Sequence, residues 1–347
     1  MKYLIVGPSW VGDMVMSQSL YITLKTLAPN AIIDVLAPAW SRPIIERMPQ
    51  VRRSIVMPVG HGQMALRLRK NIGQSLQEEH YNHAIVLPNS FKSALIPWWA
   101  KIPVRTGWHG EMRYGLINDR RKLDKFLLPR MVDRYVALAY PANSAITCTA
   151  PAPNLHVPQA QKEETLNRYG LALHRPVLGL CPGAEFGPSK QWPVGYYGEV
   201  ADIMLEKGWQ VWLFGSKNDR NTTECIRECI PDTLQPYCHN LAGKTSLADA
   251  VNLLASTHAV VSNDSGLMHI AAALNRPLVA IYGSTSATHT PPMNNNNDIL
   301  TSELKCSPCF KRECPLKHHN CMKQLVPGMV IASLDRLTRS SDQGGAL

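Results

Sequence analysis

Three glycine-containing segments of the chain carry residue types suited to group transfer. They are Gly7–Asp13, Pro182–Pro193, which contains Lys190, and Ser262–His269. A carboxylate can take a proton from a hydroxyl group, and a lysine can offset the charge of a departing diphosphate. Small residues at a helix N-terminus leave backbone N–H groups for phosphate oxygens. The combination indicates transfer from a donor that carries a diphosphate.

Asp13 is the residue that argues most directly for proton abstraction. It stands where a loop of the G-x-x-x-x-G-K type has its lysine, and the chain has no G-x-G-x-x-G. A carboxylate at a helix N-terminus repels a phosphate placed there, so we interpret Asp13 as a base. The alternative is that Asp13 only caps a helix predicted over residues 14–27.

Lys190 and Asp219 each have a functional and a structural interpretation. Lys190 is a candidate to steady a diphosphate leaving group, and the alternative is a solvated surface lysine. Asp219 follows a predicted strand, where an acidic residue often binds ribose hydroxyls. It is equally suited to be the N-cap of a helix that begins near Arg220.

Apolar runs rich in β-formers alternate with helical patterns in both halves, which predicts α/β domains with parallel sheets. Strands are predicted near residues 3–6, 32–36, 54–57, 84–87, 177–181, 210–214, 259–262 and 278–282. Helices are predicted near residues 14–27, 43–48, 63–79, 194–207, 220–229, 247–255 and 267–274. Ligands of such sheets bind beyond the carboxyl ends of the strands, where the three segments lie. We therefore expect two Rossmann-like domains with a cleft between them.

A proline-rich segment divides the two halves. Residues 141–158 contain four prolines and almost no charge, so regular structure should fail there. We assign a first domain to residues 1–155, a second to residues 160–335, and a tail to residues 336–347. Residues 290–297 are predicted to form a loop.

Charge and cysteine content bear on partners and compartment. Of the 36 Lys+Arg and 26 Asp+Glu, residues 1–150 hold 19 and 9, which leaves 17 and 17 for the rest. The excess of +10 thus lies in the first half and favours an anionic partner. Nine cysteines without an export signal indicate reduced thiols, and no run is long enough to span a membrane. We expect a cytoplasmic protein.

At this point the chain resembles the lipopolysaccharide heptosyltransferases of glycosyltransferase family 9. The resemblance covers about residues 1–335 and rests on five segments in the family's order. They are GPSWVGDMVM at 7–16, NSFKSALIPWWAKIPVRTGW at 89–108, GEMRYGLIND at 110–119, PGAEFGPSKQWP at 182–193 and SNDSGLMHIAAAL at 262–274.

The resemblance implies a GT-B fold and an inverting transfer of heptose from ADP-heptose to the first heptose of the inner core. The acceptor is then a lipid A precursor that bears heptose and Kdo. Asp13 is expected to be the base and Lys190 to steady the diphosphate. Further donor contacts are expected from Gly183, Ser189, Asp219, Asp264, Ser265, Gly266 and His269. Acceptor contacts are expected from Ser9, Trp10, Arg113, Arg120 and Arg121.

The chain lacks the Asp-x-Asp of metal-dependent glycosyltransferases, so we predict metal-independent transfer without a cofactor. Cys306, Cys309, Cys314 and Cys321 have a spacing compatible with structural zinc, which the resemblance does not favour. Leu95–Ile102, with two tryptophans and Lys101, suggests peripheral contact with the cytoplasmic face of the inner membrane or a packed helix end. Transfer to another core position and a basic protein that binds nucleotides or nucleic acid remain alternatives. The heptosyltransferase interpretation involves no nucleic acid.

Overall fold

The computed structural model divides into two compact units, Met1–His156 and Val157–Leu347. We call them the N-terminal and C-terminal units. The structure describes residues 1–59, 62–142, 144 and 149–343, with side chains to residue 339. The division falls in the proline-rich segment predicted as a linker, of which residues 143 and 145–148 lie outside the described residues.

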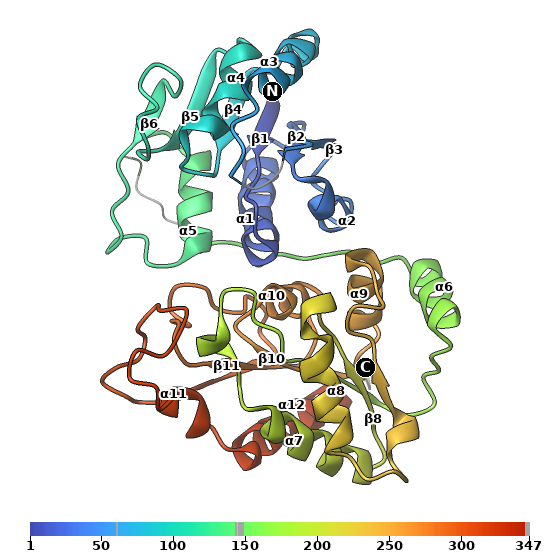
Figure 1. Cartoon of the computed structure of the whole chain (residues 1–347). Coiled ribbons are helices and arrows are strands. Elements are labelled where there is room, and N and C mark those ends of the chain that lie inside the picture. Colours follow the sequence, from blue (N-terminus) through green and yellow to red (C-terminus); the bar gives the residue numbers. More distant parts are fainter. Residues whose placement is uncertain (60–61, 143, 145–148, 344–347) are drawn as a thin grey trace. The chain divides into compact units, whose positions relative to one another are not determined.

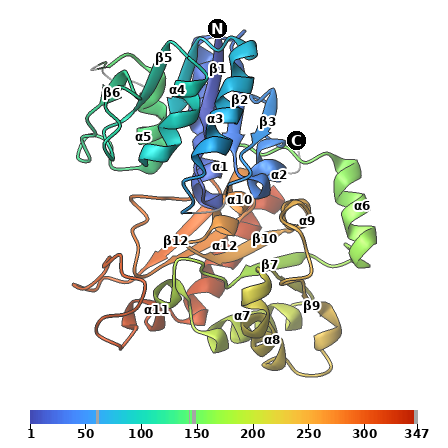
Figure 2. The same ribbon diagram turned by 45° about the horizontal axis from the view of Figure 1, so that its top comes forward.

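The N-terminal unit has a six-stranded parallel sheet in the order β3-β2-β1-β4-β5-β6 (Figure 1). Its strands are β1 (Lys2–Val6), β2 (Ile32–Ala37), β3 (Arg53–Val56), β4 (His83–Val86), β5 (Val104–Trp108) and β6 (Asp119–Arg121). Its α-helices are α1 (Val11–Leu27), α2 (Arg42–Ile45), α3 (Leu66–Ser75), α4 (Leu95–Trp99) and α5 (Met131–Val136). Helix α1 packs against α5, and α3 packs against α4 in front of the sheet in Figure 2.

The C-terminal unit repeats this topology with the order β12-β11-β10-β7-β8-β9. Its strands are β7 (Val177–Cys181), β8 (Gln210–Leu213), β9 (Cys238–Asn240), β10 (Ala259–Asn263), β11 (Leu278–Tyr282) and β12 (Asn297–Thr301). Its α-helices are α6 (Gln159–Tyr169), α7 (Val194–Glu206), α8 (Arg220–Glu228), α9 (Leu247–Leu254), α10 (Gly266–Ala273), α11 (Asn320–Lys323) and α12 (Pro327–Gln343). Helix α7 packs against α8 and α12, and α9 packs against α10 (Figure 1).

Both sheets thus have the doubly wound strand order of dinucleotide-binding folds, and the predicted α/β class is confirmed. In such sheets the order reverses between the first and fourth strands, and ligands bind beyond their carboxyl ends. The reversal lies between β1 and β4 in one unit and between β7 and β10 in the other. In each unit, the ends of these two strands are where a ligand is expected to bind.

Helix α1 is buried on most of its circumference, including its polar side chains. Gln18 donates to the backbone carbonyl of Asn154 at 2.7 Å, and Ser19 donates to that of Pro151 at 2.7 Å. These bonds satisfy the buried polar groups and tie the end of the N-terminal unit to α1.

The structure contains elements that the sequence pattern did not indicate. Strands β5, β6, β9 and β12 were not predicted, and neither was α6. Residues 336–343 were assigned to a tail, but α12 continues through Gln343, and residues 344–347 lie outside the described residues. Leu337 packs against the core of the C-terminal unit, and Arg336 pairs with Asp298 of β12. These contacts explain why the helix continues beyond residue 335, where the second domain was predicted to end.

Candidate active site

In the N-terminal unit, Asp13 lies in the first turn of α1, directly beyond β1. The N-cap residue of this helix is Trp10, whose side chain forms no capping hydrogen bond, and Asp13 is the third residue of the helix. The alternative that Asp13 is the N-cap is therefore wrong. Ser9 and Trp10, in the same loop, are exposed. Their predicted contact with the acceptor stays a prediction.

Tyr135, on α5, is the partner of Asp13 that sequence reasoning missed. Burial raises the pKa of the Tyr135 phenol well above its ordinary value, and the charge of Asp13 and a hydrogen bond to it act in the same direction. The hydroxyl therefore stays protonated and donates to the Asp13 carboxylate. Only the packing of α5 on α1 brings the two residues together, because 122 positions separate them in sequence.

In the C-terminal unit, Lys190 and Asp264 form an ion pair although they are 74 positions apart. The Lys190 ammonium lies 2.6 Å from Asp264 Oδ2, and the two side chains are only 15% and 6% exposed. Thr285, beyond β11, donates to the same carboxylate oxygen at 2.6 Å. Lys190 is thus not a solvated surface lysine, and its alternative interpretation is wrong.

Helix α10 begins directly beside this pair. Ser265 is its N-cap and accepts from the backbone N–H of Met268 at 3.3 Å, and Gly266 is its first residue. The helix has its positive end at this point, next to the Lys190 ammonium. A lysine and a helix N-terminus together form a suitable environment for a diphosphate.

His269 lies one turn into α10 and is buried. Burial lowers the pKa of its imidazole to about 4, and the Lys190 charge adds to this while the Asp264 charge opposes it. His269 is therefore neutral near pH 7, which makes it a hydrogen-bonding group without charge.

Asp219 lies beyond β8 and faces the loop that follows β7. Its carboxylate accepts from the backbone N–H and the hydroxyl of Ser216, each at 2.7 Å, which completes a capping box. Asp219 is also the N-cap residue of α8, as one interpretation predicted, but its side chain forms no capping hydrogen bond to that helix. A Cβ on Gly183 would lie 2.8 Å from this carboxylate, so only glycine allows the two loops to approach so closely.

Ser189 has a different environment from the other predicted donor contacts. It is buried, and its hydroxyl contacts Ser284 at 2.9 Å and the backbone carbonyl of Lys311. His319 Nε2 lies 3.0 Å from the Ser189 carbonyl oxygen. The geometry makes Ser189 a tie between the loop after β7 and the cysteine-rich segment, and its donor contact stays a prediction.

The predicted acceptor arginines are divided between the interior and the surface. Arg113 is 1% exposed and donates to the backbone carbonyls of Pro88 and Trp108, so it fastens the loops after β4 and β5. Arg121 pairs with Asp119 at 2.6 Å. Arg120 is exposed and stacks over a tyrosine ring. Of the three, Arg120 is placed to meet a ligand without rearrangement.

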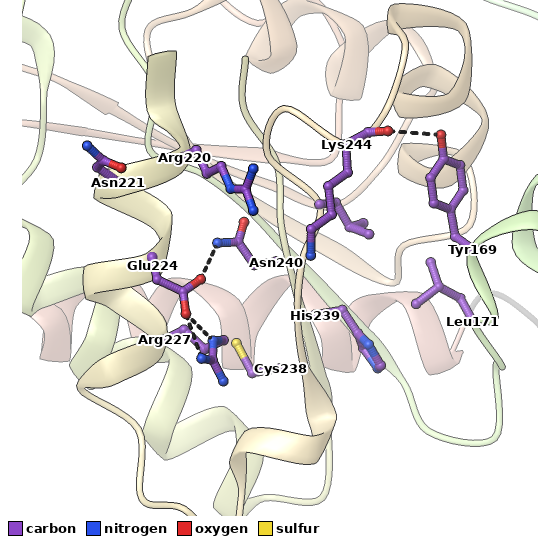
Figure 3. Close-up of a pocket in the computed structure, with 11 residues that line it drawn as sticks. Tyr169, Leu171, Arg220, Asn221, Glu224, Arg227, Cys238, His239, Asn240 and Lys244 are labelled. Carbon is purple, nitrogen blue, oxygen red and sulfur yellow. Dashed lines mark hydrogen bonds and ion pairs between the residues drawn. The ribbon is translucent and has the colours of Figure 1, made fainter. Parts of the chain in front are cut away.

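A cavity of about 570 Å³ lies in the C-terminal unit, and its lining includes Arg220, the residue after Asp219. It lies between α8, β9 and the end of α6, as Figure 3 shows. Arg220 and Lys244 point into it, while Glu224 is held by Arg227 and Asn240. Sequence reasoning did not find this cavity, since its lining comes from segments without a recognisable motif.

The four cysteines of the segment after β12 lie near one another. Burial raises the pKa of the Cys321 thiol, and the three other thiols act in the same direction. Backbone N–H groups of residues 316–319 lower the pKa of Cys314. No group of three or more His, Cys, Asp or Glu side chains in the described part of the chain is arranged to hold a metal ion.

The segment Leu95–Ile102 forms α4 and its end. Leu95, Ile96 and Pro97 are buried, whereas Trp98 is 45% exposed. Among the described residues, no helix has the length and apolar character needed to cross a membrane.

Comparison with known proteins gives consistent matches over nearly the whole chain. The family model of glycosyltransferase family 9 (heptosyltransferase) matches residues 69–320. Lipopolysaccharide heptosyltransferase 2 of Escherichia coli is 48% identical over 97% of this chain and 98% of its own. Lipooligosaccharide heptosyltransferase 2 of Haemophilus influenzae is also 48% identical, over 97% and 99%. The structure of the E. coli ADP-heptose LPS heptosyltransferase II superposes with a TM-score of 0.89 at 46% identity and covers 99% of this chain and 100% of that one.

Proposed function

Because the chain belongs to glycosyltransferase family 9, we propose a residue-level mechanism for heptose transfer from ADP-heptose to the lipopolysaccharide inner core. The chain is a heptosyltransferase with a GT-B fold. We propose that its acceptor is the first heptose of a Kdo-bearing lipid A precursor. The proposal assigns donor binding to the C-terminal unit and acceptor binding to the N-terminal unit.

The donor assignment rests mainly on the ion pair between Lys190 and Asp264 beside the start of α10. A diphosphate there meets an ammonium group and the positive end of a helix, which stabilise charge as it develops on the leaving group. Gly266 lets the backbone approach the phosphates, and His269 adds a neutral contact. We place the ribose at Asp219 and the adenine toward the neighbouring cavity.

Asp13 is proposed as the base. It takes the proton of an acceptor hydroxyl while that oxygen attacks the anomeric carbon of the donor heptose. The bond from that carbon to the diphosphate breaks in the same step, and ADP leaves with the electron pair. Attack from the side opposite ADP inverts the anomeric configuration. Tyr135 is a positioning residue, since it holds the Asp13 carboxylate and touches no reacting atom.

Metal-independent transfer is part of the proposal, because Lys190 and the α10 N-terminus supply the positive charge that a divalent cation supplies elsewhere. We also propose that the enzyme works at the cytoplasmic face of the inner membrane, where a lipid-linked acceptor is held. Chelator treatment should leave the transfer rate unchanged. A rate lost with chelator and regained with one specific divalent cation would contradict the metal-independent mechanism.

The decisive experiment measures heptose transfer and ADP binding in Asp13→Asn. The amide keeps the shape of the carboxylate but cannot accept the proton, so transfer should fall by about 10²–10⁴-fold. ADP binding should remain unchanged because it belongs to the other unit. Persistent transfer would show that another group takes the proton.

A further inference from the structure

The loops after β5 and β6 expose large apolar side chains to an unusual degree. Phe126 is 97% exposed and Leu127 is 78% exposed, while Met112 and Tyr114 are 80% and 64% exposed. The two loops follow neighbouring strands of one sheet, and large apolar side chains exposed together in this way mark a binding surface. We call these four residues and the cations between them the apolar-basic patch.

Hydrogen bonds hold the loop that carries Phe126 and Leu127 in a defined conformation. Asp124 Oδ1 accepts from the backbone N–H groups of Phe126 at 2.8 Å and Leu127 at 3.2 Å, which holds the backbone of the turn that carries these two side chains. The carbonyl of Leu128 accepts from Arg134 Nε at 2.9 Å, so the loop is fastened to α5. A fixed turn loses little conformational entropy when it binds a partner.

The cations of the patch do not form ion pairs within the described part of the chain. Arg120, Lys122 and Lys125 are exposed, and none of them forms an ion pair with another described residue. Arg120 lies 4.3 Å from the centre of the Tyr114 ring, which joins the two loops. Of the nearby acids, Asp119 is paired with Arg121, whereas Asp124 and Glu111 accept from backbone N–H groups and keep their negative charge. The three unpaired cations outnumber these two carboxylates, so the net charge of the patch is positive.

The patch lies at the same edge of the sheet as Asp13. Strands β1, β5 and β6 are parallel members of one sheet, so the loops that follow them emerge at one edge. In Figure 1 the chain between β6 and α5 runs outside the sheet as an irregular segment. A surface at this edge is placed to meet whatever carries the acceptor.

We propose that the apolar-basic patch docks on an anionic phospholipid bilayer, with Phe126 and Leu127 inserted among the lipids and the cations at the headgroups. The inference rests on the proposed function in that a lipid-linked acceptor brings the enzyme to a membrane. Aromatic and aliphatic side chains flanked by lysine and arginine are the combination that binds such an interface. The patch, rather than α4, is then the principal membrane contact.

The test is sedimentation of the full-length protein with phosphatidylcholine vesicles that contain or lack phosphatidylglycerol. Wild type should bind only the anionic vesicles, and added salt should release it. Phe126→Ser/Leu127→Ser should lower the partition coefficient by about tenfold or more. Lys125→Glu should lower it by about fivefold for each unit of charge removed.

A matched control changes two exposed aliphatic residues of the C-terminal unit, Leu173→Ser/Val326→Ser, which are 46% and 45% exposed in the wild type. These should bind vesicles as wild type does. Equal binding by wild type and the Phe126→Ser/Leu127→Ser variant would overturn the proposal. The proposal would also be overturned if wild type bound no vesicles but formed a concentration-dependent dimer that the variant does not form. The patch would then be a contact between two copies.

Transfer to a delipidated, water-soluble acceptor separates this inference from the proposed function. The Phe126→Ser/Leu127→Ser variant should transfer to it at the wild-type rate and should be slower only with acceptor embedded in vesicles. Lack of transfer by wild type to either acceptor would refute the proposed function. Normal transfer by the variant to both acceptors would refute the membrane contact alone.

Discussion

Replacement of Lys190 by methionine should damage both stability and chemistry, by separable amounts. The substitution keeps the length of the side chain and removes its charge, so Asp264 retains only the hydrogen bond from Thr285 at the shared oxygen. Removing one partner of a buried ion pair costs about 3–5 kcal/mol. For a unit of this size each kcal/mol lowers Tm by roughly 2–4 °C, so Tm should fall by about 6–20 °C.

The effect on catalysis comes from the leaving group. The charge that develops on the diphosphate loses an ammonium group fixed in a partly buried site, which is worth about 10²–10³-fold in kcat. The free energy of unfolding and the rate of heptose transfer are measured on the same preparation. Lys207→Met is the matched control, because it breaks an exposed ion pair with Asp335 and should cost no more than about 1 kcal/mol.

The double variant Lys190→Met/Asp264→Asn distinguishes the two effects. It removes both charges, so most of the lost stability should return, while transfer should stay low because no cation faces the diphosphate. If transfer returns together with stability, Lys190 serves only to neutralise Asp264 and the catalytic assignment is wrong. If Lys190→Met leaves Tm unchanged, the ion pair itself does not form.

Three further predictions follow from single contacts. Tyr135→Phe should lower kcat by about tenfold and shift the low-pH limb of the rate profile to higher pH. The substitution removes a hydrogen bond to the charged form of Asp13, and this loss raises the pKa of that carboxyl. An unchanged profile would argue against that contact. The contribution of His269 to the free energy of unfolding should be constant above about pH 6.5 and fall by about 3 kcal/mol toward pH 4. The reason is that its pKa is about 4 in the folded protein, so the unfolded chain binds the proton more readily. Denaturation measured as a function of pH should lack this component in a His269→Gln variant. Gly183→Ala should raise KM for ADP-heptose, because its Cβ displaces the carboxylate 2.8 Å away, whereas Gly195→Ala, with no atom within 4 Å of the new Cβ, should leave KM unchanged; equal KM values in steady-state assays would show that the loop yields without cost.

The pattern of apolar residues sufficed to predict the central strands, because strands buried on both faces are continuous runs of aliphatic residues. It missed β5, β6, β9 and β12, three of which are edge strands, although it found the edge strand β3. Strand β6 is Asp-Arg-Arg and β9 is Cys-His-Asn, each paired on one side only, and such short polar strands carry no hydrophobic signal.

The site was predictable to the extent that it lies in glycine-containing loops after central strands. Lys190 and Asp264, both chosen from such loops, pair with each other because the strand order places the ends of β7 and β10 side by side. Tyr135 was not predictable, since its role depends on the packing of α5 against α1. Arg113 illustrates the opposite error: an arginine in a basic segment looks like a ligand contact, and only its burial reveals the carbonyls it holds.

The two units share one strand order but differ in the charge beyond the strands where that order reverses. In the N-terminal unit, Asp13 stands at a helix start and its partner Tyr135 is neutral, so the local charge is negative and unsuited to a phosphate. In the C-terminal unit, the carboxylate of Asp264 is offset by Lys190 and Thr285, so the positive end of α10 is not cancelled. In the proposed mechanism, the same fold therefore supplies a base in one unit and a diphosphate site in the other. The difference arises from one lysine and its partner rather than from topology, which is why the Lys190 and Asp13 variants should fail in different ways.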